Sequence, residues 1–231
     1  MPSRADVRAA LSAALPVMLG YVAIGIPCGV MSAEVGLSPA VAFLLSATFY
    51  SGAGQFMMAS LALAGTPLPS MVASVALVST RQILYSAALS PYVARAPRPL
   101  AALFAATVTD ESFGVNLGRF ASEEPWTAAQ ATVVNLASML SWASANAVGA
   151  LVGPALAVPT AIMSFAMTSI FVCLLVAQRW TPVTAVVVAV SAGCVVAMKA
   201  LGLGSLSVLL GALAGVAAGM VAAARRREGA S

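Results

Sequence analysis

The chain contains no histidine, only three cysteines and few charged residues, and each shortage excludes a class of protein. Cys28, Cys173 and Cys194 lie in separate apolar runs without CxxC spacing, so we expect neither a disulfide framework nor a zinc site, and no cofactor. Only 8% of the 231 residues are charged and 61% are hydrophobic, far from the composition of a soluble domain. The composition predicts an integral membrane protein.

The few charges are concentrated near the termini and in predicted turns. Basic residues of this kind are Arg4, Arg8, Arg95, Arg98 and 225–227. Such clusters are typical of the cytoplasmic loops of membrane proteins, so the net charge of +4 does not indicate a nucleic-acid surface. Apolar stretches recur along the whole chain, and we therefore predict a single membrane transporter domain over residues 1–231 with the lipid bilayer as its surroundings.

Proline, glycine and charge divide the chain into eight apolar segments, which predict an all-α polytopic membrane protein. The segments are 11–31, 40–64, 69–90, 99–119, 130–151, 161–178, 183–199 and 202–224. Two alternatives remain open: seven or eight full spans, or about six full spans with segments 40–64 and 161–178 broken or re-entrant. The distribution of basic residues slightly favours the second alternative. It also permits an inverted repeat of the two halves, as in many secondary transporters.

Three charged residues lie within apolar segments rather than at their ends. Arg95, in the turn between two segments, is fourteen residues after Arg81 and fifteen before Asp110, and Glu111 follows directly. If both segments are helical, the three charges share a depth roughly 21 Å from the turn, inside a bilayer core about 30 Å thick. Charges at such a depth are costly and mark functional sites.

The chemistry of these side chains leaves two roles open for the arginine. The guanidinium of Arg81 matches either an acidic side chain of the next segment or the carboxylate of an amino-acid substrate. Tyr85 lies one helical turn away on the same stripe. Helical phase points Asp110 about 100° away from Glu111, so one acid can pair with Arg81 while the other carries protons or meets a substrate ammonium. A fixed internal ion pair is the alternative.

The centre of segment 40–64 contains two glycines next to an amide side chain. Gly52 and Gly54 weaken a helix where backbone groups must otherwise be satisfied internally, and Gln55 follows them. Unwound backbone at this position would present amides to a carboxylate or an ion. We therefore count Gly52, Gly54 and Gln55, with Arg81 and Tyr85, as candidate substrate-binding residues.

The same residues carry a resemblance to a known family. The motifs, in order, are 51–56 (Ser-Gly-Ala-Gly-Gln-Phe), Arg81, 84–86 (Leu-Tyr-Ser), Leu89, Pro91, Tyr92, 109–113 (Thr-Asp-Glu-Ser-Phe), 141–142 (Ser-Trp) and 165–175. In this order and spacing the chain resembles the AzlC family. The resemblance implies a bacterial inner-membrane permease that exports branched-chain amino acids together with a small AzlD-like membrane subunit.

One motif departs from the family pattern. Where Asn-Leu-Arg-His is common, this chain has Ser79-Thr80-Arg81-Gln82. If the histidine moves protons in the family, the resemblance implies that Asp110 or Glu111 takes over that role here. We therefore expect a proton-coupled transporter, while the identity of the amino acid is left open.

Two other classes of function are alternatives to transport. A structural or channel-like subunit of a two-component complex would use Arg81 and the acids as a permanent bridge. An intramembrane enzyme would need serine with histidine, paired aspartates or metal ligands. The absence of histidine, with a single aspartate inside the apolar segments, argues against an enzyme.

Overall fold

The computed structural model describes residues 3–156, Phe165, Ser169, Val172, Val176, 180–202 and 204–228. Regular structure in these residues is entirely α-helical, which confirms the predicted all-α polytopic fold. The chain forms two compact units, Met1–Ile170 and Phe171–Ser231, which are described separately. Most of the predicted segment 161–178 lies outside the described residues, so its re-entrant form and the inverted repeat stay predictions.

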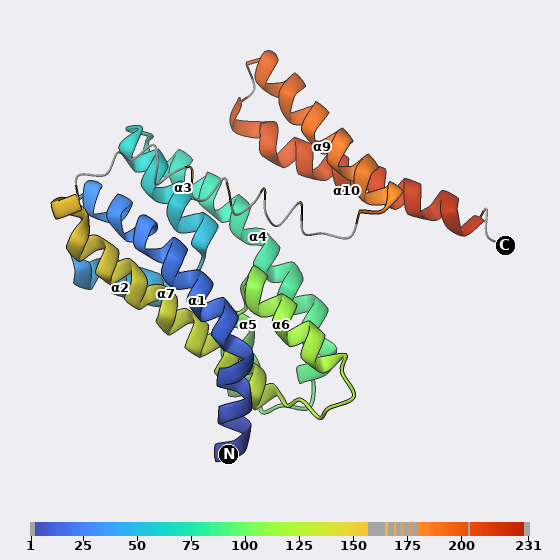
Figure 1. Ribbon diagram of the computed structural model, residues 1–231. Coiled ribbons are helices and arrows are strands. Elements are labelled where there is room, and N and C mark those ends of the chain that lie inside the picture. Colours follow the sequence, from blue (N-terminus) through green and yellow to red (C-terminus); the bar gives the residue numbers. More distant parts are fainter. Residues whose placement is uncertain are drawn as a thin grey trace. The chain divides into compact units, whose positions relative to one another are not determined.

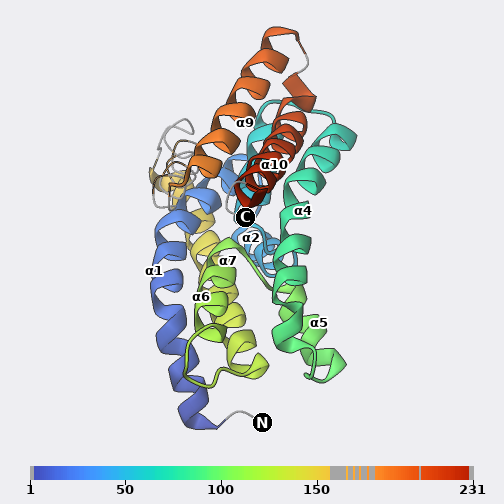
Figure 2. The same cartoon turned by 90° about the vertical axis from the view of Figure 1, so that its right-hand side faces the viewer.

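Three long helices frame the first unit: α1 (Arg4–Glu34), α4 (Leu68–Val93) and α7 (Ala128–Leu156). Each is long and apolar enough to cross a membrane, and α9 (Pro182–Ala200) of the second unit is the fourth such helix in the described part of the chain. Figure 1 and Figure 2 show α1 and α7 running from the N-terminal end of the unit to the opposite end, while α4 runs back.

Glycines bring α1 and α7 into close contact. A Cβ atom at Gly29 would collide with the backbone carbonyl of Asn146, and one at Gly149 would collide with the carbonyl of Ile26. Small residues allow membrane helices to approach in this way, since lipid provides no hydrophobic force between them. The α1–α7 pair is therefore the scaffold on which the shorter helices are placed.

Segment 40–64 forms a re-entrant hairpin. It divides into α2 (Pro39–Thr48) and α3 (Gly52–Leu63), with the non-helical residues 49–51 between them. The hairpin begins where α1 ends and finishes where α4 begins, which is the same end of the unit (Figure 1). At 1.5 Å per residue each arm reaches only about halfway through a bilayer.

Segment 99–119 forms a second re-entrant hairpin, and here the prediction of one continuous helix is wrong. Helix α5 (Arg98–Ala106) ends before Thr107, and α6 (Asp110–Phe120) begins after Thr109. This hairpin enters from the opposite end of the unit, between α4 and α7 (Figure 2). The break was missed because Thr107–Thr109 contains neither glycine nor proline, and the groups that stabilise it come from another helix.

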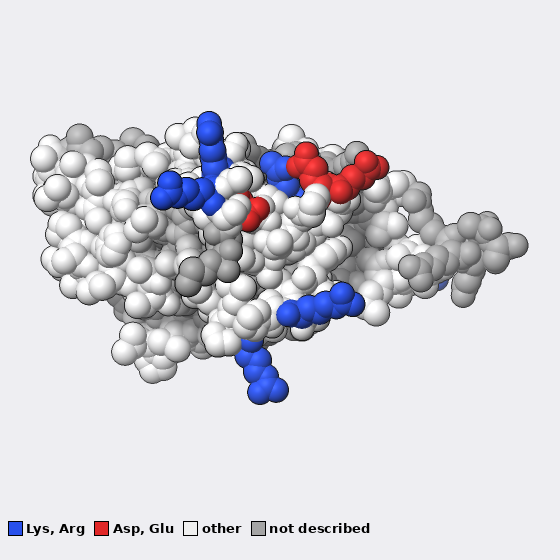
Figure 3. Space-filling view, turned by 90° about the horizontal axis from the view of Figure 1, so that it is seen from below, with Lys and Arg blue, Asp and Glu red and all other residues white. Residues whose placement is uncertain are grey.

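The second hairpin also decides at which end of the first unit Arg119 lies. Because α6 returns to the end from which α5 entered, Arg119 lies at the same end as the N-terminus. The arginines at this end of the first unit are Arg4, Arg8, Arg95, Arg98 and Arg119. Figure 3 looks onto this end and shows Lys and Arg side chains spread across it. The rule that cytoplasmic loops are basic therefore favours one orientation for the whole first unit.

The second unit is a pair of packed helices, α9 and α10 (Gly204–Glu228). Gly202 has φ of +77° in the turn between them, a conformation that side chains other than glycine rarely adopt. Gly211 and Gly215 of α10 lie against Ser191 and Val195 of α9, so this pair also packs through small residues.

Candidate functional site

The tips of the two hairpins meet beside Tyr21, near the middle of α1. The Tyr21 hydroxyl lies 2.7 Å from Oγ1 of Thr109, the last residue of the α5–α6 break. Its ring packs edge-on against the ring of Tyr50, in the α2–α3 break, with centroids 6.1 Å apart. Both tyrosines are buried. Residues from α1 and from both hairpin tips thus form one hydroxyl cluster.

Arg81 and Asp110 form an ion pair next to this cluster. The guanidinium Nη2 is 2.9 Å from Oδ2 of Asp110, and the two side chains are 26% and 21% exposed. The other carboxylate oxygen, Oδ1, is buried and has no hydrogen-bond partner among the described residues. Tyr85 lies near the same carboxylate and stacks on Phe113 with ring centroids 4.9 Å apart. The three charges predicted to share one depth are thus brought together, although not by two continuous helices.

Glu111 is directed away from the ion pair. Its Oε2 accepts a hydrogen bond of 2.6 Å from the Tyr21 hydroxyl. Asp110 and Glu111 are the first two residues of α6, where negative charge is favourable because the helix dipole is positive there. The first turn of α6 therefore presents one acid to α4 and the other to α1.

The side chain of Gln55 stabilises the tip of the first hairpin through hydrogen bonds. Its Nε2 donates to the carbonyl of Phe49 at 2.6 Å, and its Oε1 accepts from Trp142 Nε1 at 3.0 Å and from Ser46 at 3.1 Å. Gln82, on α4, donates to the carbonyl of Tyr50 at 2.9 Å. Two amide side chains therefore satisfy the carbonyls that the break leaves without helical partners.

The predicted glycines lie in a helix rather than in unwound backbone. Gly52 and Gly54 lie in the first turn of α3, and the non-helical residues 49–51 precede them. A Cβ atom at Gly54 would lie 2.8 Å from Ser51 Oγ and 2.9 Å from the ring of Phe49. The Gly54 amide donates to Ser51 Oγ at 3.2 Å. The glycine is required because the break folds back against the helix that it starts.

The second hairpin tip has its own amide support. Asn135 of α7 donates to the carbonyl of Phe104 at 3.2 Å and to Thr107 Oγ1 at 3.3 Å, and it accepts from Asn116 at 2.9 Å. Asn135 and Asn116 are fully buried. This network lies between α5, α6 and α7 and fixes the break at Thr107.

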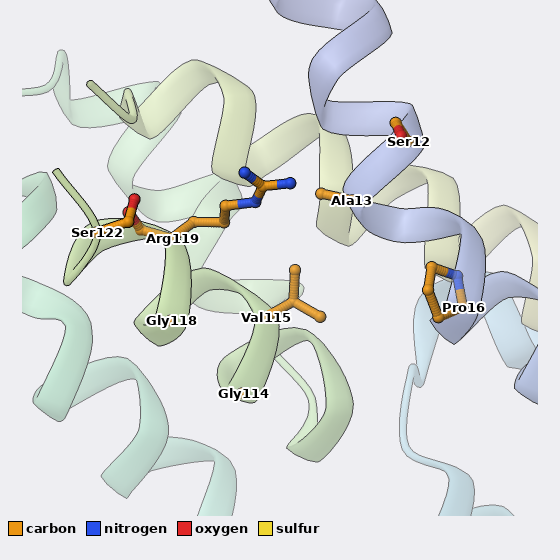
Figure 4. Close-up of a pocket in the computed structure, with 8 residues that line it drawn as sticks. All are labelled: Ser12, Ala13, Pro16, Gly114, Val115, Gly118, Arg119 and Ser122. Carbon is orange, nitrogen blue, oxygen red and sulfur yellow. The ribbon is translucent and has the colours of Figure 1, made fainter. Parts of the chain in front are cut away.

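An open groove lies between α1 and α6, near the arginine-rich end. It has a volume of about 490 Å³ and is bordered by Gly114, Gly118 and Arg119 of α6 and by Ser12, Ala13 and Pro16 of α1 (Figure 4). No described atom lies within 4 Å of a Cβ built at Gly114 or Gly118. The spacing of these two glycines would let another helix approach closely, but none does so in the described part of the chain.

Several residues of the cluster were missed in the sequence. Tyr21, Tyr50 and Thr109 are ordinary residues in apolar runs, and only the meeting of the two hairpins gives them a shared position. The single available signal was Thr109, which directly precedes the two acids. Trp142 packs in the core against Tyr21 with ring centroids 5.4 Å apart.

Comparison with known proteins places the chain in a family. The AzlC protein family matches residues 16–156, which include both hairpins and the whole cluster. The chain belongs to the AzlC family. No solved structure matches it.

Three relatives illustrate the range of the similarity. The inner membrane protein YgaZ of Escherichia coli is 25% identical over 183 residues, covering 77% of this chain and 75% of its own length. The branched-chain amino acid transport protein AzlC of Bacillus subtilis is 24% identical over 179 residues, covering 75% and 68%. An uncharacterized membrane protein of Archaeoglobus fulgidus is 28% identical over 214 residues, covering 90% and 91%. The predicted multi-pass membrane location is confirmed.

Proposed function

We propose that this AzlC-family protein is a secondary transporter of the bacterial inner membrane that exports branched-chain or similar amino acids in exchange for protons. The proposal rests on one observation: two re-entrant hairpins, from opposite ends of the unit, meet at the hydroxyl cluster, and one basic and two acidic side chains (Arg81, Asp110 and Glu111) lie beside it. Broken helices that meet at mid-depth are the usual binding sites of secondary transporters. The name of the Bacillus subtilis relative supports the substrate class.

A zwitterionic amino acid matches the groups at the cluster. Arg81 and the amides at the start of α3 receive the substrate carboxylate, because helix N-termini present unpaired N–H groups to anions. The acids at the start of α6 offer negative charge to the ammonium or bind the coupled proton. Tyr85 borders the site beside Asp110. Gln55 contributes indirectly, by fixing the break from which α3 starts.

We propose a small AzlD-like membrane subunit as the partner. The main alternative is that this chain is a structural subunit and that the partner carries the substrate. If the protein were a structural subunit, Arg81 and Asp110 would form a permanent bridge and the partner would carry the substrate path. Transport measured with each protein alone and with both together separates these roles.

The test is transport in reconstituted vesicles with an imposed pH gradient. We expect leucine, isoleucine or valine to move against its gradient when protons flow the opposite way, and to do so at least about tenfold more slowly with Arg81→Ala, a loss of about 1.4 kcal/mol of transition-state stabilisation. Arg95→Ala, in the turn after α4, is the matched control and retains transport. Transport by the partner alone, or transport by the two proteins together that Arg81→Ala leaves unchanged, would overturn the proposal.

A further inference from the structure

We infer that the Glu111 carboxylate is a shared site for which a proton and the ammonium group of the substrate compete, so that this competition couples export to proton entry. The inference rests on the proposed function and deepens it, because it assigns different tasks to Asp110 and Glu111. It also names the substrate class as α-amino acids with an unmodified ammonium group.

The first argument is the difference between the partners of the two acids. Asp110 faces the guanidinium of Arg81 at 2.9 Å, and arginine keeps its proton at any physiological pH. The negative charge of that carboxylate is therefore balanced by Arg81. Glu111 is hydrogen-bonded to a hydroxyl and forms no ion pair within the part of the chain that the structure describes. Its negative charge is the one that a proton or a substrate cation can neutralise.

The second argument is that the hydrogen bonds at Glu111 suit both protonation states. When Glu111 is ionised, Tyr21 donates to its Oε2 and accepts from the hydroxyl of Thr109. When Glu111 is protonated, its O–H donates to the Tyr21 oxygen, and the Tyr21 proton turns to Thr109 Oγ1. A hydroxyl is both donor and acceptor, so no buried polar group loses its partner in either state. A lysine or arginine in place of Tyr21 would hold the glutamate in one state.

The third argument is the charge of the surroundings. The groups that face Glu111 are Tyr21 on α1, Tyr50 in the α2–α3 break, Arg81 and Tyr85 on α4, and Asp110 on α6. The tyrosines are neutral, and Arg81 balances Asp110. One unbalanced negative charge therefore remains in a poorly solvated site, which makes a single proton or a single ammonium the favoured addition.

The fourth argument concerns the other end of the substrate. The Tyr50 hydroxyl is buried, with the residue 7% exposed, and it has no hydrogen-bond partner among the described residues. Tyr50 directly precedes Ser51, the N-cap of α3, so the segment that carries this unpaired hydroxyl also leads into the amides of a helix start. In our proposal the Tyr50 hydroxyl donates to the substrate carboxylate, while the ammonium on the same carbon atom binds Glu111. The pair of sites selects α-amino acids over amines and over simple carboxylic acids.

These arguments give an exchange cycle. On the cytoplasmic side an amino acid enters, its ammonium replaces the proton on Glu111, and that proton leaves to the cytoplasm. On the other side a proton from the medium binds Glu111 and displaces the amino acid. Each turn moves one substrate out and one proton in, and no other reactant is needed.

The test is binding of L-leucine to the purified full-length protein over a pH series. For the wild type we expect affinity to fall about tenfold for each pH unit below the midpoint, with about one proton released per leucine bound there and none well above the midpoint, as linkage requires for one shared site. Glu111→Gln removes both the pH dependence and the proton release, and it weakens binding at alkaline pH. Glu124→Gln, the same change at an exposed position after α6, retains the behaviour of the wild type.

Tyr21→Phe provides a second variant that keeps the aromatic packing. Loss of its hydroxyl removes a donor to the ionised carboxylate, so the proton is retained to higher pH and the binding midpoint moves upward. Leucine binding by Glu111→Gln with the full pH dependence of the wild type, or an unmoved midpoint in Tyr21→Phe, would overturn the inference. Absence of branched-chain amino-acid binding and transport in the wild type at every pH would instead overturn the proposed function.

Discussion

The two re-entrant hairpins are alike in build and different in chemistry. The first has arms of 10 and 12 residues and the second has arms of 9 and 11, and in each a Ser or Thr ends the break and begins the second arm. The α2–α3 tip carries no charge and closes on itself through Gln55 and Ser51. The α5–α6 tip starts with two acids that point to other helices. The first hairpin therefore contributes backbone held by its own side chains. The second contributes two charged side chains that contact other helices.

The cause of the difference is the origin of the supporting groups. The carbonyls of the first break are satisfied by Gln55, three residues into α3, and by Gln82. The end of α5 is instead held by Asn135 of α7 and the start of α6 by Ser112, so Asp110 and Glu111 are not needed for support. They remain available for Arg81 and Tyr21. Substitutions at the two tips test this difference.

The largest effect on stability is expected from the charged tip, with Asp110→Asn. This change leaves Arg81 in the membrane interior without its carboxylate, and breaking a buried pair costs about 3–5 kcal/mol. Because both side chains are about a quarter exposed, we expect the lower end of that range. Thermal unfolding in detergent measures the loss, and the double variant Arg81→Met/Asp110→Leu recovers most of it. A double variant as unstable as Asp110→Asn would show that the pair is not the cause.

The next effect is expected from the supporting amides, with Gln55→Leu compared with Asn135→Leu. Each change leaves buried polar groups without a partner, at about 1–3 kcal/mol per group. Gln55→Leu is the more damaging, because the Phe49 carbonyl, Ser46 and Trp142 all lose a partner. Both variants are compared in unfolding and in leucine binding. If Gln55→Leu keeps its stability and loses only binding, the residue contacts substrate directly, as the sequence alone predicted.

A smaller effect is expected from glycines near the two tips. Gly54→Ala places a methyl group within 3 Å of Ser51 and Phe49 and should destabilise by about 1–3 kcal/mol. Gly114→Ala, in α6, meets no described atom and should be neutral or stabilising by about 0.5–1 kcal/mol, since alanine favours a helix. The difference in unfolding free energy between the two variants is the measurement. Equal effects would mean that both arms are packed alike.

The smallest effect is expected from the capping hydroxyls. Ser51→Ala removes the bond to the Gly54 amide and should cost about 1 kcal/mol. Thr109→Val should cost a similar amount and should also change transport, because its hydroxyl lies 2.7 Å from that of Tyr21. Ser38→Ala, the cap at the start of α2 away from the tips, is the control for a loss of capping alone. Normal transport by Thr109→Val would show that the Thr109 hydroxyl is not needed for proton exchange at Glu111.

Much of this architecture was visible in the sequence, and the exceptions have a common cause. Gly52, Gly54 and Gln55 marked the first break, since glycine weakens a helix wherever it stands. The second break had no such mark, because Thr107 and Thr109 are tolerated in helices and the stabilising Asn135 comes from another segment. The pairing of Arg81 with an acid followed from the cost of an isolated charge in the membrane. The depth argument for it, however, assumed one continuous helix over residues 99–119, and the structure divides that segment into α5 and α6.

Composition and hydropathy by themselves determined that this chain lives in a bilayer, that its helices carry the fold, and that Arg81, Asp110 and Glu111 must find partners there. Those conclusions are local, because they depend on the transfer cost of each residue from water to lipid. Tertiary structure alone decided that Asp110 meets Arg81 while Glu111 meets Tyr21, and that Gln55 supports backbone. These pairings form because two hairpins meet from opposite ends of the unit. Short sequence patterns do not show which residues from distant segments will come into contact.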